Sequence, residues 1–168
     1  MKYFAGVGSR KVIQHAPELE PILKAITQCL NDQGYTLRSG GAEGCDKWFE
    51  AGARDDMKEI FYAGDATEES LKIASEIHPA WHRCSEWAQN LHGRNVFQVL
   101  GKDLQTPVDF LICWTQYGKD QGGTRTAIML AKQRNIPVLN FGRIDKHKEA
   151  FEAFMLCQGL DVDLAKYL

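Results

Sequence analysis

Three glycine-rich turns hold most of the residues whose types and spacing could do chemistry. The first is Gly8-Ser9-Arg10, the second is Ser39-Gly40-Gly41-Ala42-Glu43-Gly44-Cys45-Asp46, and the third runs from Gln121 to Ala127. Glycine lets a backbone approach a ligand without interference from Cβ. A helix that begins at such a turn presents unpaired amides and the positive end of its dipole. Turns of this kind suit a phosphate group.

Polar side chains in these turns have candidate roles beside the backbone. Ser9 could hydrogen-bond a phosphate and Arg10 could pair with it as a two-pronged fork, or the two could be a helix cap and a solvated arginine. Asp46 could cap a helix or hold a ribose hydroxyl. The third turn is the predicted main phosphate cradle, with the amides of Gly122 and Gly123, the hydroxyls of Thr124 and Thr126, and the charge of Arg125.

The elements that must position these turns alternate along the chain. Apolar runs at 3–7, 35–37, 59–62, 108–114 and 136–141 predict strands, and helical periods at 17–31, 46–54, 67–77, 80–101, 124–134 and 146–158 predict helices. This order predicts one α/β Rossmann-like domain over residues 1–168, with a core at 3–141. We expect a mostly parallel sheet of about five strands with helices on both faces. The turns would then meet at the carboxyl edge of the sheet, where open parallel sheets bind ligands.

Composition narrows the function classes. The 168 residues include 20 Lys plus Arg and 22 Asp plus Glu, and the net charge of −2 gives no general attraction to nucleic acid or to an anionic membrane. The five cysteines form no C-x-x-C pair, and His82 and His92 are ten residues apart, so the sequence predicts reduced thiols, no metal site and no cofactor. The chain begins directly with a strand pattern and shows no signal peptide or membrane span, which favours the cytoplasm.

The segment from Ala80 to Gly101 combines aromatic and polar residues at helical spacing. Its large apolar side chains are predicted to be core residues or contacts with a partner chain. Arg94 and Asn95 could hold a base or a phosphate over the edge of the sheet, or Arg94 could make ordinary surface pairs. The apolar side chains concerned are Trp81, Trp87, Leu91 and Phe97.

Taken in order, these motifs resemble the SLOG superfamily of Rossmann-like proteins, which includes the DNA-processing protein A family and the Lonely Guy phosphoribohydrolases. The resemblance covers residues 3–141 and rests on the turns at 6–10 and 39–46, the pair Arg94-Asn95, Gly122-Gly123-Thr124 before a helix, and Ile136-Pro137-Val138. The chain is also similar to small phage and bacterial members of that superfamily. The resemblance implies a nucleotide-like ligand held by the glycine turns, and a homodimer or higher homo-oligomer with residues 81–100 as the interface to test.

In the phosphoribohydrolases an arginine of an H-x-R-K segment and a glutamate after the glycine-threonine turn cleave the base from a nucleoside 5′-monophosphate. His92-Gly93-Arg94-Asn95 matches the first element in part, and Ile128 stands where the glutamate would align. Glycosidic cleavage requires a carboxylate near the anomeric carbon, and here Glu43 or Asp46 would have to supply it.

Three functions therefore stay open. The missing glutamate favours a nucleotide binder without chemistry, acting as a sensor or a sequestering protein. The first alternative is an N-glycosidic hydrolase with Arg94 orienting the substrate and Glu43 or Asp46 as the acid. The second is single-stranded DNA binding, which is disfavoured because Glu43 stands where the DNA-processing relatives have an arginine.

Overall fold

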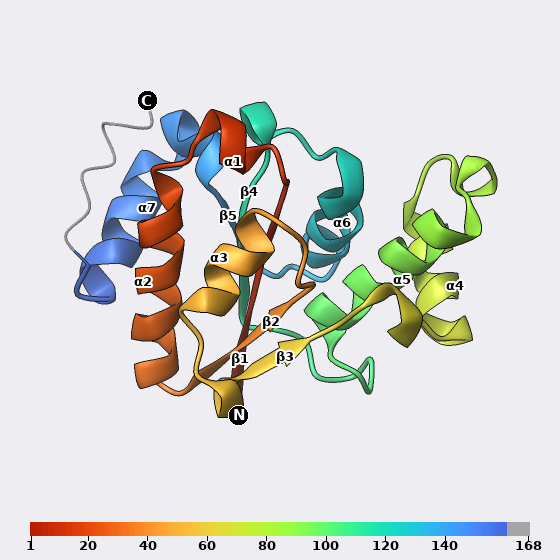
Figure 1. The fold of residues 1–168 in the computed structure, drawn as a ribbon, viewed down its shortest axis with the longest axis horizontal. Helices are drawn as coiled ribbons and strands as arrows, with labels where there is room; N and C mark the ends of the chain where they lie inside the picture. Colours follow the sequence, from red (N-terminus) through yellow and green to blue (C-terminus); the bar gives the residue numbers. More distant parts are fainter. Residues whose placement is uncertain (161–168) are drawn as a thin grey trace.

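The structure, a computed structural model, describes residues 1–160, apart from the side chains of residues 145–147 and 150. Five strands form one sheet in the order β3-β2-β1-β4-β5, and every neighbouring pair is parallel (Figure 1). The predicted α/β Rossmann-like fold is therefore confirmed, with an entirely parallel sheet. The strands are β1 (Lys2–Gly8), β2 (Tyr35–Ser39), β3 (Lys58–Ile60), β4 (Phe110–Trp114) and β5 (Val138–Asn140).

The centre of the sheet is β1, whose residues from Phe4 to Val7 are buried. Such a continuous apolar run is typical of a parallel strand that is covered on both faces. The pairing sets Gly8 opposite Trp114 at the end of β4, so β1 and β4 end together. The chain builds β2 and β3 on one side of β1 and then crosses to β4 on the other side. The carboxyl ends of β1 and β4 therefore flank the point where the strand order reverses, which is the usual ligand position in this class of sheet.

Helices cover both faces of the sheet, as the sequence predicts. One hydrophobic cluster joins β1 to α1, α2, α3 and α7, and a second joins the other face to α4, α5 and α6. Figure 1 shows α4 and the outer half of α5 lying beyond the sheet, away from α7. The helices are α1 (Val12–His15), α2 (Leu19–Asp32), α3 (Cys45–Ala51), α4 (Glu68–Ile77), α5 (Glu86–Leu100), α6 (Arg125–Gln133) and α7 (Ile144–Cys157).

Several boundaries differ from the sequence-based ones. The helix predicted over 46–54 ends at Ala51, and Gly52, which follows it, packs directly against the backbone of α2. The stretch predicted over 80–101 is divided: a 3₁₀ turn covers Trp81–Arg83, and α5 starts after Ser85, whose hydroxyl accepts a hydrogen bond from the Ala88 amide at 3.1 Å. The last helix begins at Ile144 instead of residue 146. From residue 161 onward, the tail predicted after this helix lies outside the described residues.

Within residues 1–160, no helix combines the length and the apolar character that crossing a bilayer requires.

Candidate functional site

A cavity of about 950 Å³ opens at the carboxyl edge of the sheet. Its walls are the segments that follow β1, β2, β3 and β4, closed on one side by α5 and on another by the turn before α6. This volume lies within the range of small-molecule sites. The predicted site residues that line it are Gly8, Ser9, Arg10, Gly40, Gly41, Asp46, Arg94, Asn95, Gly122, Gly123 and Thr124.

Five predicted residues lie outside this lining, and each has another place in the fold. Ser39 is buried and its hydroxyl donates to the Gly6 carbonyl oxygen at 2.6 Å, which ties β2 to β1. Gly44 is buried against the backbone of Ser9 and Arg10, Glu43 is exposed, and Thr126 hydrogen-bonds to His92. Arg125 is half-buried, and its Nη1 is buried without a partner among the described residues.

Arg94 is the buried cation of the cavity, with only 9% of its surface exposed. Its Nη1 donates to the Gly40 carbonyl oxygen at 2.7 Å, and its Nε donates to Asn95 Oδ1 at 3.2 Å. Burial lowers the pKa of the guanidinium, and the charge of Arg10 acts in the same direction while Asp46 opposes both. Nη2 has no hydrogen-bond partner among the described residues, so this donor is available to a ligand.

Asp46 is the buried carboxylate of the same cavity, with 4% of its surface exposed. Oδ2 accepts a hydrogen bond from the Ala42 amide at 3.3 Å, whereas Oδ1 is buried and has no hydrogen-bond partner in the part of the chain that the structure describes. Burial raises the pKa of this carboxyl to about 6, against the opposing effects of Arg94 and of nearby backbone amides. The sequence left Asp46 and Glu43 as alternatives for the acid, and the structure places only Asp46 beside Arg94 in the cavity.

The second turn contains a glycine that this arrangement requires. A Cβ on Gly40 would lie 2.5 Å from both Arg94 Nη1 and Gln98 Nε2. A side chain at this position would therefore push the two polar groups away from the end of β2. Gly8 has a similar role, because a Cβ there would lie 2.5 Å from Cys45 Sγ and would hold α3 away from β1.

The third turn leaves its backbone open to the cavity. Gly122 has φ +69°, and a Cβ on Gly122 or Gly123 would meet nothing within 4 Å. No side chain caps the start of α6. The Gly123 carbonyl oxygen accepts a hydrogen bond from Asn95 Nδ2, which fastens the turn to α5. The backbone of Gly122, Gly123 and Thr124, just before α6, therefore lines the cavity.

One face of α5 contributes more to the cavity than the sequence analysis recognised. Trp87, Leu91, Arg94, Asn95 and Gln98 all line it, and their spacing of four, three, one and three residues is the repeat of one helix face. Polar residues on the inner part of this helix face were the signal that pointed to a cavity, but only Arg94 and Asn95 were named from it, and Gln98 was missed. Lys11 and Tyr62 were also missed, because nothing local marks them.

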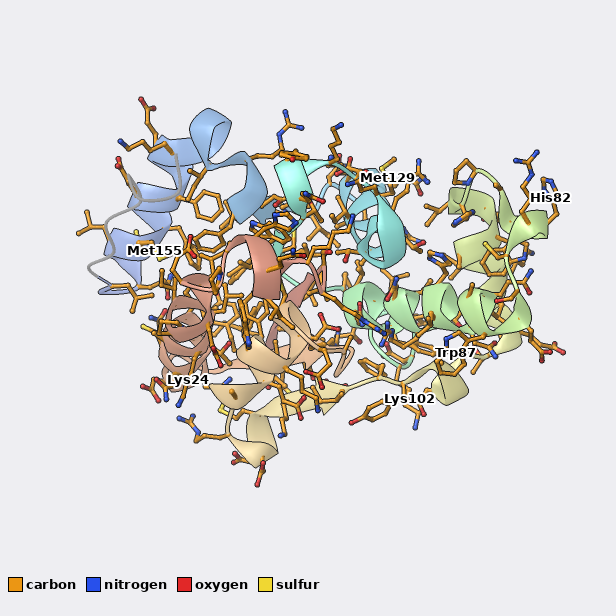
Figure 2. The ribbon with its side chains drawn as sticks, turned by 45° about the horizontal axis from the view of Figure 1, so that its top comes forward. Lys24, His82, Trp87, Lys102, Met129 and Met155 are labelled. Atoms are coloured by element: carbon orange, nitrogen blue, oxygen red, sulfur yellow. The ribbon has the colours of Figure 1, made fainter. Side chains whose placement is uncertain are left out.

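The aromatic residues of this segment divide into two groups. Phe97 is buried in contact with Phe61, at 5.6 Å between ring centroids, as a core residue should be. Trp87 is 66% exposed, and Figure 2 shows it projecting from α5. Of the two alternatives predicted for Trp87, a core residue or a contact with a partner chain, the structure excludes the first, because the outer part of α5 extends past the sheet, and the second stays a prediction. Tyr62, which is 54% exposed, lines the same cavity.

Comparisons of the chain with protein-family models, with curated proteins and with solved structures give no significant match. Assignment of a function must therefore rest on the cavity. It offers a buried cation, a buried carboxyl with a free oxygen, open backbone turns and two exposed aromatic rings. Such a set can hold an anion at one end and a flat, apolar group at the other.

Proposed function

We propose that this protein binds a nucleotide or a nucleotide-derived small molecule in the cavity at the carboxyl edge of the sheet, as a sensor or a sequestering protein. The observation that carries the proposal is Oδ1 of Asp46, which has no partner among the described residues and is buried in the same cavity as Arg94 and the open glycine turn at Gly122 and Gly123. A buried acceptor without a partner costs free energy until a donor reaches it. A ribose hydroxyl or a base N–H is such a donor, and a nucleotide also brings the anion that the turns suit.

The phosphate end of such a ligand fits the turns after β1 and before α6. Arg10 and Lys11 are exposed at the first of these and line the cavity. Gly122, Gly123 and Thr124 supply open backbone at the second. Charge-assisted bonds from an arginine fork combined with backbone amides are a common way to hold phosphate.

The base end fits Tyr62 and Trp87. Both rings line the cavity and are more than half exposed, so neither is occupied by core packing. Stacking on an aromatic ring contributes about 1–3 kcal/mol per base and tolerates any base, because every base has a flat π-face. The proposal therefore specifies the class of ligand and leaves the base open.

The test uses a panel of nucleoside mono-, di- and triphosphates and cyclic nucleotides, with thermal stability and base release followed in the same samples. A ligand that prefers the folded state raises Tm, and we expect a rise of several degrees without released base. Trp87→Ala and Arg10→Ala are each expected to weaken binding roughly ten-fold. Tyr117→Ala and Arg83→Ala are matched controls, because both residues are exposed and neither lines the cavity. No stabilisation by any compound, or equal loss in the controls, would reject the proposal.

A second function, hydrolysis of an N-glycosidic bond, is favoured by one observation. The pKa of Asp46 is raised to about 6, so its carboxyl exchanges a proton close to neutral pH, as a general acid must. In that case base is released, and Asp46→Asn abolishes turnover while the nucleotide still binds. Unchanged turnover in Asp46→Asn would exclude this role. Binding of single-stranded DNA, the remaining alternative, would instead show an affinity that falls steeply with salt.

A further inference from the structure

Three potential metal ligands that are well separated in the sequence meet outside the nucleotide cavity. His78 follows α4, Cys84 follows the 3₁₀ turn Trp81–Arg83, and His92 lies in α5. One ligand atom from each lies within 4.8 Å of the others. We propose that His78, Cys84 and His92 bind a zinc ion or a similar thiophilic divalent metal. The sequence predicts no metal site. The proposal differs from that prediction because the connection between α4 and α5 folds these three side chains together.

The distances fit a tetrahedral ion. Zinc bonds of about 2.3 Å to sulfur and about 2.0–2.1 Å to nitrogen, at the tetrahedral angle, place the sulfur and the nitrogen roughly 3.5 Å from each other. Cys84 Sγ lies 3.7 Å from His78 Nε2 and 3.9 Å from Nδ1. The His78 and His92 rings are 4.6 Å apart between centroids. Small side-chain adjustments therefore bring the three atoms into bonding range.

His92 is already oriented for this role. Its Nδ1 hydrogen-bonds to Thr126 Oγ1 at 2.8 Å, which leaves Nε2 as the nitrogen available to a metal. A histidine ligand in metalloproteins usually has its second nitrogen held in this way. His78 Nδ1 accepts a hydrogen bond from the Ala80 amide at 3.1 Å, and the Cys84 thiol donates to the Ala80 carbonyl oxygen at 3.7 Å. Ligation through Nδ1 and the thiolate displaces these two hydrogen bonds.

The thiol determines which metals fit. Binding converts the Cys84 S–H to a metal–sulfur bond and releases its proton to solvent, so the ion and the thiolate together carry one positive charge. The anionic sulfur is therefore the ligand on which binding depends, and a set of two imidazoles and one thiolate favours zinc over magnesium or calcium. His78 and Cys84 are half-buried, so water can reach the site and complete a tetrahedron.

The test loads the metal-stripped full chain with Co²⁺ as a spectroscopic substitute for Zn²⁺. We expect one Co²⁺ per chain, with a thiolate-to-cobalt charge-transfer band, and displacement of Co²⁺ by Zn²⁺. Cys84→Ser removes the band, and Thr126→Val lowers the Zn²⁺ affinity about ten-fold through the loss of the His92 orientation. His82→Asn and Cys157→Ser are the controls and keep the band: His82 is exposed and points outward in Figure 2, and Cys157 is exposed on α7.

A second measurement keeps the test valid if a variant fails to fold. In the wild-type chain Zn²⁺ is expected to slow alkylation of Cys84 at least ten-fold and to leave Cys157 unchanged. Absence of the charge-transfer band, its survival in folded Cys84→Ser, or alkylation of Cys84 that Zn²⁺ does not slow would each overturn the proposal. None of these outcomes depends on whether the other cavity binds a nucleotide.

Discussion

Replacing Asp46 by asparagine tests the electrostatics of the cavity without any knowledge of the ligand. The pKa of this carboxyl is about 6 in the folded protein, against an ordinary value of 3.8, and burial is the main cause. The folded state therefore binds the proton more tightly than the unfolded state does. Wild-type stability gains from this group below pH 4, and that gain is lost as pH rises from about 4 to about 6. Asparagine does not titrate and its oxygen can still accept from the Ala42 amide.

The magnitude follows from the shift. A difference of 2.2 pKa units, from 3.8 to about 6, corresponds to about 3 kcal/mol at roughly 1.4 kcal/mol per unit. The attraction between Asp46 and Arg94 is already included in this pKa. Because part of this effect falls below pH 4, we expect the free energy of unfolding of Asp46→Asn minus that of the wild type to rise by about 2.5 kcal/mol between pH 4 and pH 7.

Urea unfolding followed by circular dichroism at four pH values between 4 and 7 measures this difference directly. The comparison between the two chains matters, because burial lowers the pKa of His92 to about 4 and makes stability rise over the same pH range. His92 is present in both chains, so its contribution cancels. Asp56→Asn is the control, since Asp56 is exposed and its side chain has no ion pair among the described residues, and this variant should not reproduce the rise. A flat difference for Asp46→Asn as well, or one that falls with pH, would refute the assignment of Asp46 as a buried, destabilised carboxylate.

Two further predictions concern the scaffold that holds the cavity. Gly52→Ala should destabilise the fold by about 2–4 kcal/mol, because its Cβ would lie 2.1 Å from the Lys24 carbonyl oxygen where α3 meets α2. The control is Gly64→Ala, where a Cβ meets nothing within 4 Å, and it should change the free energy of chemical unfolding by less than about 0.5 kcal/mol. Equal effects of the two substitutions would contradict the packing argument. Arg38→Leu should cost about 2–3 kcal/mol, since buried Arg38 donates to the Thr106 carbonyl oxygen at 2.5 Å and pairs with Glu59 at 3.4 Å. A loss no larger than that of the exposed Arg134→Leu in the same unfolding assay would show that these contacts contribute nothing.

Local chemistry explains which parts of the fold the sequence predicts. Parallel strands buried on both faces require continuous apolar runs, and helices beside them require a 3.6-residue period, so the alternation of the two patterns indicates the sheet. The register itself follows from pairing between distant segments, such as Phe4 with Phe110, and no local pattern encodes it. The contact of Gly52 with α2, just after the end of α3, is likewise between segments that are distant in the sequence.

The cavity shows the same division. Glycine turns after strands were readable in the sequence because their position at the carboxyl edge follows from the parallel order alone. The sequence did not show which acid enters the cavity. Glu43 and Asp46 are only three residues apart, and the direction of the chain into α3 leaves the first exposed and the second buried. Thr126 was predicted to face a phosphate, and the packing of α6 on α5 turns it to His92 instead.

The sequence by itself therefore determined the fold class, the order of the elements and the edge of the sheet where the glycine turns meet, because these depend on composition and periodicity within short segments. Only the tertiary structure decided that Arg94 and Asp46 share one cavity, that Trp87 is exposed at it, and that His78, Cys84 and His92 meet. These depend on contacts between elements, where burial, charge and distance are properties of the packed chain and of no single segment.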